Sequence, residues 1–357
     1  ISNQISTTSF DEKLPKGAWL TVALLFFIGA LNYLDRIMIT TMRSSIIDSM
    51  PMTEAQFGLL TSAFLWTYGI LSPFAGYVAD RFNRSKVVMV SLFVWSLITW
   101  ITAYSRTFEQ LLATRILMGI SEACYIPAAL ALIADYHRSS TRSLATGIHM
   151  TGVMIGSSLG FIGGMVAENI AWNSPFILFG IIGTVYSVVI AFVLRDPPKD
   201  PESKANVSLA GKVSFLEGVY DLFRKRAFLL MLGYWGLLGV VGWMVIGWLP
   251  TYYKEHFNLS QGIAGLYATG YLYPAQIVGL LLGGFLLYVA SVLLIVSIPL
   301  LAMKNKTGWY IATTAALATA VVSFQGFIVR SSTEWLQGGI LSLVIFSTIR
   351  FPSLLMH

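Results

Sequence analysis

The sequence predicts an all-α integral membrane protein with a polar linker between two sets of helices. Of its 357 residues, 56% are hydrophobic and only 11% are charged, whereas a soluble domain carries about 25% charged residues. The chain also holds successive apolar runs of about 20 residues, the length that a helix needs to cross a bilayer. Helices are the expected form because backbone groups inside lipid must bond within their own segment.

The first half contains six apolar runs, which we expect to be membrane spans. They cover about 17–41, 56–79, 87–105, 108–134, 143–167 and 172–194. An even number of spans returns the chain to the side on which it started. Residues 1–198 are therefore predicted to form an N-terminal six-helix bundle.

The segment 199–225 predicts a cytoplasmic linker, because it follows two adjacent prolines and mixes acidic with basic residues. Within Val213–Phe223, apolar residues at near-helical spacing stand beside basic ones. This pattern indicates an amphipathic helix that lies on the membrane surface.

Residues 226–357 are predicted to form a second helical bundle. Its apolar runs cover about 227–253, 262–287, 288–303, 308–329 and 335–350. The second and third runs meet at Leu287–Tyr288 without the polar connection that two spans need outside the lipid. We therefore expect residues to be missing there, so that the second half is incomplete in this sequence.

The basic residues predict the orientation of the chain. Lys and Arg concentrate in the loops on the side of the N-terminus, whereas the opposite side holds only Arg43, Arg106 and Lys254 as far as the eighth span. Basic loops stay in the cytoplasm, which predicts a cytoplasmic N-terminus and a multi-pass protein of the cell membrane. The same asymmetry explains the net charge of +6 without a nucleic-acid partner.

The loop after the second span reads Gly76-Tyr-Val-Ala-Asp80-Arg81-Phe-Asn-Arg84-Ser-Lys86. A glycine at the end of a span permits close helix contact, and Asp80 can pair with a basic group or with the N-terminus of a neighbouring helix. Such a contact must break when two bundles rock, so Gly76, Asp80, Arg81 and Arg84 are predicted gating residues. A basic turn that only orients the helices is the alternative.

This loop closely resembles the loop signature of the major facilitator superfamily. The segment Arg115-Ile-Leu-Met-Gly119-Ile-Ser-Glu122-Ala123 resembles the fourth-helix pattern of the same family. The resemblance implies two pseudo-symmetric six-helix bundles, a twelve-helix plan, with a substrate site near the middle of the membrane.

Two further segments resemble two neighbouring branches of that family. These segments are Asn32-Tyr33-Leu34-Asp35-Arg36 and Trp248-Leu-Pro250-Thr-Tyr252. One branch comprises anion:cation symporters for sugar acids and related organic anions. The other is the spinster-like branch, which is associated with lysolipids and sphingoid phosphates. Both branches share these residues, so the motifs do not choose between them.

Four charged residues fall inside the predicted spans. At a rise of about 1.5 Å per residue, Asp35 and Arg115 each lie about 9 Å from the midpoints of their spans, on the same side. Glu122 follows Arg115 by two turns on one helical face. Charges at such depth are costly and usually pair or face a water-filled cavity. We expect Asp35, Arg36, Arg115 and Glu122 to line one central cavity; an internal charge-paired strut is the alternative.

The chemistry of these groups suggests their roles. Arg36 and Arg115 carry planar forks that suit carboxylate or phosphate oxygens, so they are predicted to bind substrate. Glu122, with Asp35 as the other candidate, is predicted to carry a coupling proton, because protonating the acid would free an arginine for the anion. Sodium in place of the proton remains an alternative.

Further substrate contacts are predicted from polar and aromatic residues in the spans. These are Tyr33, Tyr234, Tyr267, Tyr271 and Gln276. Tyr267 and Tyr271 are four residues apart and share a helical face. Core packing is the alternative for the deeper aromatic residues.

Small residues on the fifth span predict close helix packing. Gly152, Gly156 and Gly160 recur at four-residue spacing and are followed by Gly163 and Gly164. Such a stripe lets a neighbouring backbone approach closely inside a membrane.

The sequence disfavours an enzyme or a channel. Its four histidines lack metal-ligand spacing, no GxxxxGK phosphate loop occurs, and nothing resembles a selectivity filter. We expect a monomeric secondary transporter without cofactor or metal, working by alternating access. The first candidate is symport of a small organic anion, such as a sugar acid, with protons. The alternative is spinster-like transport of a lysophospholipid or sphingoid phosphate.

Overall fold

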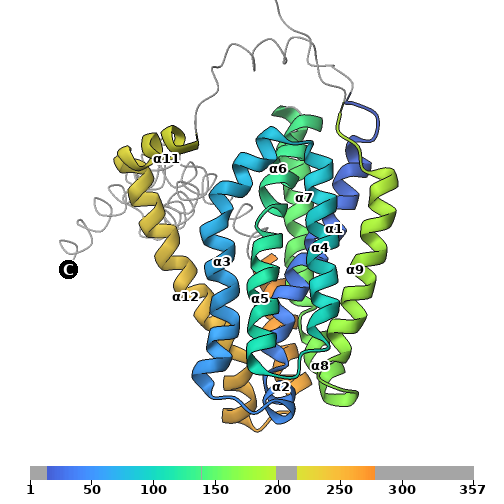
Figure 1. Ribbon diagram of the computed structural model, residues 1–357, viewed down its shortest axis with the longest axis vertical. Helices are drawn as coiled ribbons and strands as arrows, with labels where there is room; N and C mark the ends of the chain where they lie inside the picture. Colours follow the sequence, from blue (N-terminus) through green and yellow to red (C-terminus); the bar gives the residue numbers. More distant parts are fainter. Residues whose placement is uncertain (1–13, 138, 198–214, 278–357) are drawn as a thin grey trace, which may run out of the picture. The chain divides into compact units, whose positions relative to one another are not determined.

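The computed structural model describes residues 14–137, 139–197 and 215–277, and the elements within these ranges are helices (Figure 1). They are α1 (Ala18–Thr41), α2 (Arg43–Ser49), α3 (Glu54–Arg81), α4 (Arg84–Thr102), α5 (Phe108–Glu122), α6 (Tyr125–Tyr136), α7 (Ser139–Ser158), α8 (Phe161–Asn169), α9 (Ser174–Val193), α11 (Phe215–Arg224), α12 (Arg226–Phe257), α13 (Gln261–Gly265) and the π-helical turn η1 (Leu266–Gly270).

Seven stretches among the described residues are long and apolar enough to cross a membrane. They are Ala18–Thr41, Glu54–Arg81, Arg84–Thr102, Phe108–Tyr136, Thr141–Asn169, Ser174–Val193 and Arg226–Phe257. The six spans predicted for the first half and the first span of the second half are thereby confirmed. The predicted spans 288–303, 308–329 and 335–350, the junction at Leu287–Tyr288 and residues 278–287 of the run 262–287 lie outside the described residues.

Polar side chains fix where several spans begin. Thr53 accepts a hydrogen bond from the backbone N–H of Gln56, whose side chain accepts one from the backbone of Thr53 in return. The side chains of Asn83 and Thr107 likewise accept a hydrogen bond from a first-turn N–H, that of Lys86 in α4 and that of Gln110 in α5. These bonds satisfy N–H groups that the first turn of a helix leaves free.

Two of the spans are interrupted. The fourth span is divided into α5 and α6 at Ala123–Cys124, and the fifth into α7 and α8 at Leu159–Gly160. The first interruption directly follows Glu122, which is the last residue of α5.

The glycine stripe of the fifth span packs against α1, as the spacing predicts. A Cβ atom at Gly152 would overlap the carbonyl oxygen of Phe26, and one at Gly156 would overlap that of Ala30. Gly164 also approaches α1 closely, since a Cβ there would stand 2.8 Å from the carbonyl oxygen of Thr41. The predicted close contact is confirmed, and it brings α1 and the α7–α8 span together at backbone distance.

The remaining first-half helices complete a bundle around α1. In Figure 1 the long helices run roughly along one direction, with α4 beside α9 and α3 beside α5. One apolar core surrounds Trp95 and Tyr125, and a second surrounds Phe57 and Phe176.

The amphipathic helix predicted at 213–223 is observed as α11, starting at Phe215. Its Phe215 ring stacks on Phe74 of α3, with ring centroids 4.6 Å apart. Its apolar residues Leu216, Tyr220 and Phe223 are exposed. Its placement on a membrane surface remains a prediction.

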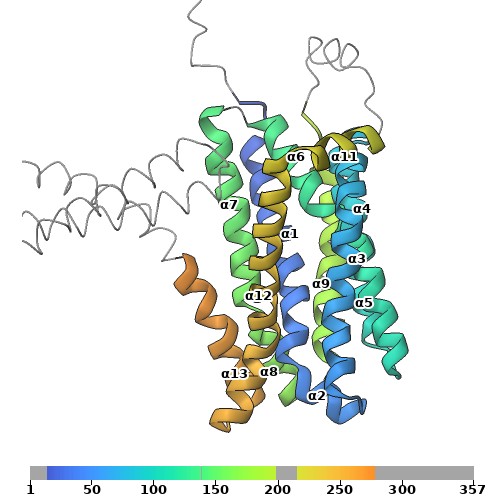
Figure 2. The same cartoon turned by 90° about the vertical axis from the view of Figure 1, so that its left-hand side faces the viewer.

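The chain divides by contacts into a unit that ends at Pro274 and a second that begins at Ala275. The first unit includes α12 and α13 because both pack on first-half helices; α13 lies against α8 in Figure 2. The division expected from helix order, at 198 and 226, remains a prediction about the whole chain.

Candidate functional site

Four buried charges meet in the interior of the first unit. Asp35 and Arg36 come from α1, and Arg115 and Glu122 come from α5. None of the four is more than 4% exposed. The structure therefore places together the four residues that the depth argument selected; their lining of a substrate cavity remains a prediction.

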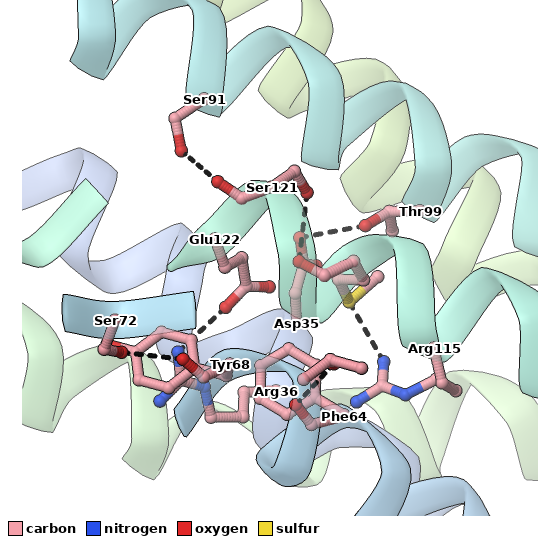
Figure 3. Close-up of polar contacts among 12 residues, drawn as sticks. Asp35, Arg36, Phe64, Tyr68, Ser72, Ser91, Thr99, Arg115, Ser121 and Glu122 are labelled. Carbon is pink, nitrogen blue, oxygen red and sulfur yellow. Dashed lines mark hydrogen bonds and ion pairs between the residues drawn. The ribbon is translucent and has the colours of Figure 1, made fainter. Parts of the chain in front are cut away.

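Arg36 forms an ion pair with Glu122 inside this cluster. Its Nη2 atom donates to Oε2 of Glu122 at 2.9 Å, and both side chains are almost fully buried (Figure 3). A charge-assisted hydrogen bond of this kind is about twice as strong as a neutral one. The pair neutralises two charges that would otherwise be costly at this depth.

Aromatic rings surround the Arg36 guanidinium. Its Cζ atom lies 4.5 Å from the ring centroid of Tyr68, 4.6 Å from that of Tyr33 and 4.9 Å from that of Phe64. Trp243 of α12 contributes a fourth ring at 5.9 Å. Each ring face attracts a cation, by about 0.5–2 kcal/mol depending on desolvation. Glu122 and the rings thus form a cage around one guanidinium.

Asp35 and Arg115 do not pair with each other. Thr99 of α4 donates to Oδ2 of Asp35 at 3.2 Å, and Oδ1 has no hydrogen-bond partner among the described residues. Arg115 Nη1 contacts the Met118 sulfur at 3.1 Å, while its Nε lacks a partner in the described part of the chain. The Phe64 ring, 5.0 Å from Arg115 Cζ, thus contacts both arginines. Arg115 consequently keeps donor capacity for an anion.

The other predicted substrate contacts are spread over several places. Tyr33 joins the cage, but Tyr234 is 39% exposed and packs edge-on against Trp235. The rings of Tyr267 and Tyr271 stack at 5.5 Å, which confirms that they share a face, and both are exposed. Gln276 is exposed and belongs to the second unit. Their contact with substrate remains a prediction.

The predicted gating loop ties the α3–α4 turn to α6. The Nη2 atom of Arg84 lies 3.6 Å from Oδ1 of Asp80. Its Nη1 atom forms an ion pair with Asp135 and donates to the carbonyl oxygen of Ala131 at 3.2 Å. Arg81 covers the Tyr77 ring at 4.2 Å.

The sequence predicts a close helix contact at Gly76, and for the described part of the chain this prediction is wrong. A Cβ atom there would meet no atom within 4 Å among the described residues, because this part of α3 borders open space. The gating role of this loop remains a prediction.

A second polar network joins the two halves of the sequence at the opposite end of the bundle. Glu168 at the end of α8 accepts hydrogen bonds from the backbone N–H groups of Gln261 and Gly262, at 3.1 and 2.8 Å. The Gln261 side chain in turn donates to the Ser45 hydroxyl at 2.8 Å and to the Gly164 carbonyl at 3.1 Å. We call these residues the end network.

Charged residues extend the end network along α2 and α12. Arg43 forms ion pairs with Glu54 and with Glu255, and Lys254 donates to the Ser44 hydroxyl. The dipole of α13 also favours the carboxylate of Glu168, which lies at the N-terminus of this helix. This end is therefore held closed by bonds between first-half and second-half helices.

Sequence reasoning did not find several residues of the site. Phe64, Tyr68 and Thr99 complete the cluster, and Glu168 and Gln261 hold the closed end. The one available signal was the four-residue spacing of Phe64 and Tyr68, which places them on one face of a helix. Glu168 and Gln261 follow no motif, because their contact joins segments far apart in the sequence.

Comparisons with known proteins agree with this architecture. The family model of the Major Facilitator Superfamily matches residues 25–355. The human protein spinster homolog 1 is 30% identical over 244 residues, which are 67% of this chain and 46% of that protein. The Drosophila melanogaster protein spinster is 26% identical over 249 residues, 69% of this chain and 41% of that protein.

An MFS-type efflux pump of Mycolicibacterium smegmatis is 25% identical over 285 residues, 78% of this chain and 65% of that protein. A solved structure of a bacterial homologue of the human lysosomal transporter spinster, in an inward-facing and unoccupied conformation, is 24% identical. It superposes with a TM-score of 0.65 and covers 94% of this chain and 80% of its own, which shows the shared fold. The chain spans about half the length of the spinster relatives it matches. With a family model that matches nearly all of its sequence, the chain belongs to the Major Facilitator Superfamily.

Proposed function

We propose that this membrane transporter moves an anionic amphipath, such as a lysophospholipid, and binds its anionic head at Arg36. The observation that carries the proposal is the buried Arg36–Glu122 pair inside a cage of aromatic rings. A planar guanidinium suits phosphate or carboxylate oxygens. The surrounding rings offer apolar surface to the part of the substrate next to its head.

The choice of an amphipath rests on two arguments. Spinster proteins recur among the relatives, and the spinster-like branch is the one associated with lysolipids. The aromatic rings around Arg36 also offer apolar surface, which a sugar acid does not need. The second candidate is proton symport of a small organic anion, such as a sugar acid. It is favoured by Arg115, whose Nε offers a second guanidinium donor to the carboxylate of a compact anion.

Exchange of partners at Arg36 would couple transport to a proton. Protonation of Glu122 removes its charge and weakens its bond to Arg36, which leaves the guanidinium free for the substrate anion. Asp35, held by Thr99 alone on one oxygen, is the second candidate carrier. Sodium is the alternative coupling ion.

The end network fits one stage of an alternating-access cycle. It closes the end of the bundle at α2, α8 and α13, so substrate would reach Arg36 from the end at which α3 meets α4. On the orientation inferred from the basic loops, that end faces the cytoplasm. We further propose that the protein works as a monomer in the cell membrane. In the complementary stage the bonds of Glu168 and Arg43 must open.

A binding experiment tests the proposal directly. The purified full chain is heated in detergent with lysophosphatidylglycerol, lysophosphatidylcholine, glucuronate or galactonate, and the unfolding temperature is read from tryptophan fluorescence. A ligand that binds only the folded state raises this temperature with its concentration. We expect a rise with lysophosphatidylglycerol that is lost in Arg36→Lys, which keeps the charge but lacks the planar fork.

Arg106→Lys is the matched control, because Arg106 is exposed and lies in the turn between α4 and α5, outside the cluster. It should respond like the unmodified chain. Stabilisation by sugar acids but not by lysolipids would favour the organic-anion symporter. Equal responses of Arg36→Lys and the unmodified chain would overturn the assignment of Arg36.

A further inference from the structure

An apolar groove of about 590 Å³ lies on the outside of the bundle, bounded by the end of α3, by α4 and by α5. Its wall includes Val90, Val94 and Ile98 of α4 with Leu117 and Ile120 of α5. The volume is within the range of about 300–1,000 Å³ that is typical of ligand pockets.

The groove is separate from the charged cluster. On α5, Leu117 and Ile120 lie on the face opposite to Arg115 and Glu122, since successive residues turn by about 100° around a helix. Leu117 is 50% exposed and Ile120 is 44% exposed, whereas both charged residues are buried. The groove thus opens toward the surroundings of the bundle, which in a membrane are lipid.

The hydroxyl groups at the groove are satisfied by the protein. Ser91 donates to the carbonyl oxygen of Ser121 at 2.6 Å, and Ser121 donates to that of Met118 at 3.0 Å (Figure 3). The wall therefore behaves as an apolar surface and offers little to water.

One cation stands at the end of the groove. Lys86 in the first turn of α4 lines it, is exposed, and makes no ion pair with a described residue. The neighbouring Arg84 is already engaged by Asp80 and Asp135. Lys86 is consequently available to an anion outside the protein.

The dimensions of the groove match one half of a bilayer. From Lys86 to Ile98, α4 rises about 18 Å, and the hydrocarbon of one leaflet is about 15 Å thick. The positive group at the interface is complementary to the anionic head of a phospholipid. The apolar wall, which reaches toward the midplane, is complementary to its acyl chain.

We propose that this groove binds one anionic diacyl phospholipid of the surrounding leaflet, with its phosphate at Lys86 and an acyl chain between α4 and α5. The site lies outside the transport pathway, so the lipid is a bound component of the bilayer and not the substrate. It braces α3, α4 and α5 against one another.

Cys124 provides a reporter for this site. It lines the groove, is partly buried, and is the only cysteine in the sequence. The full chain is delipidated in detergent, supplied with phosphatidylglycerol or phosphatidylcholine, and treated with a membrane-permeant maleimide. We expect phosphatidylglycerol to slow the labelling of Cys124 more than phosphatidylcholine does.

Variants separate the contribution of the head from that of the chain. Lys86→Ala should weaken protection by phosphatidylglycerol about fivefold, since one lysine near an anionic lipid contributes about 1 kcal/mol. Val94→Trp should abolish protection by filling the groove. The matched controls are Lys16→Ala, an exposed lysine of another segment, and Val189→Trp on the exposed face of α9. Both should keep the protection of the unmodified chain.

Two results would overturn the proposal. Equal protection by both lipids in the unmodified chain would exclude recognition of the anionic head. Undiminished protection in Val94→Trp would show that the acyl chain lies elsewhere. Protection in Val94→Trp is measured against the labelling rate of Cys124 in the same variant without lipid. A lower unfolding temperature of this variant therefore does not change the conclusion.

Discussion

Replacing Glu122 by leucine should destabilise the protein because it leaves Arg36 buried without its partner. The two side chains are joined at 2.9 Å and are 3% and 0% exposed, so water cannot take the place of the carboxylate. Removing one member of a buried ion pair typically costs about 3–5 kcal/mol. We expect Glu122→Leu to lower the free energy of unfolding by this amount.

The double variant Arg36→Met with Glu122→Leu should be more stable than Glu122→Leu alone. Replacing both members of a buried pair by apolar residues is often neutral or stabilising. The recovery is incomplete here, because methionine does not reproduce the attraction of the guanidinium to the rings of Tyr33, Phe64 and Tyr68, about 0.5–2 kcal/mol each. With each ring near the lower limit of about 0.5 kcal/mol, the loss of the three contacts takes about 1.5 from the recovered 3–5 kcal/mol. We therefore expect a net gain of about 2 kcal/mol over Glu122→Leu.

Unfolding in mixed micelles, followed by tryptophan fluorescence, measures these free energies. Glu109→Leu is the control on the same helix, since Glu109 is exposed near the start of α5, and it should cost less than about 1 kcal/mol. A double variant no more stable than Glu122→Leu would refute the reasoning. If the double variant folds but no longer responds to lysolipid, the pair also serves binding and is not only a strut.

Three more outcomes follow from individual contacts. Gly156→Ala should destabilise by about 1–3 kcal/mol because the added methyl group overlaps α1, whereas Gly147→Ala on the same helix meets open space; unfolding in mixed micelles compares them. Glu168→Ala should shift the equilibrium toward an open α8–α13 end, because two backbone N–H groups lose their acceptor; distances between spin labels across this end should lengthen, unlike in Asn169→Ala. Thr99→Val should lower the stability by about 1 kcal/mol, and an unchanged unfolding free energy would show that its bond to Asp35 contributes nothing.

The length of the apolar runs predicted the membrane-spanning helices well, because the thickness of a bilayer fixes how many apolar residues a helix needs to cross it. It did not predict the break after Glu122, since Ala123 and Cys124 carry no turn signal. The glycine stripe of the fifth span succeeded for a local reason: the residues that permit close packing are themselves the pattern.

Counting residues from the midpoint of each span predicted that the four charged residues lie near one another in the interior. It did not predict which of them bond to each other. Asp35 and Arg115 lie at matching depth, yet Asp35 bonds to Thr99 while its neighbour Arg36 takes Glu122. Adjacent residues point about 100° apart around a helix, and only the placement of α4 and α5 relative to α1 decides which side chain each one meets. The contacts of Glu168 likewise depend on tertiary packing that no local pattern encodes.

The backbone contact between α1 and the α7–α8 span determines which parts of the protein can move. Gly152 and Gly156 bring the two helices so near that sliding would force carbonyl oxygens against neighbouring atoms. Asp35 and Arg36 must therefore travel with the first-half bundle as one rigid body. The surface that α12 and α13 share with this bundle carries hydrogen bonds and ion pairs that water can replace, as at Glu168. Rotation between the two halves would open there, and the geometry around Arg36 would survive the movement except at Trp243, the one ring of the cage that comes from the other side.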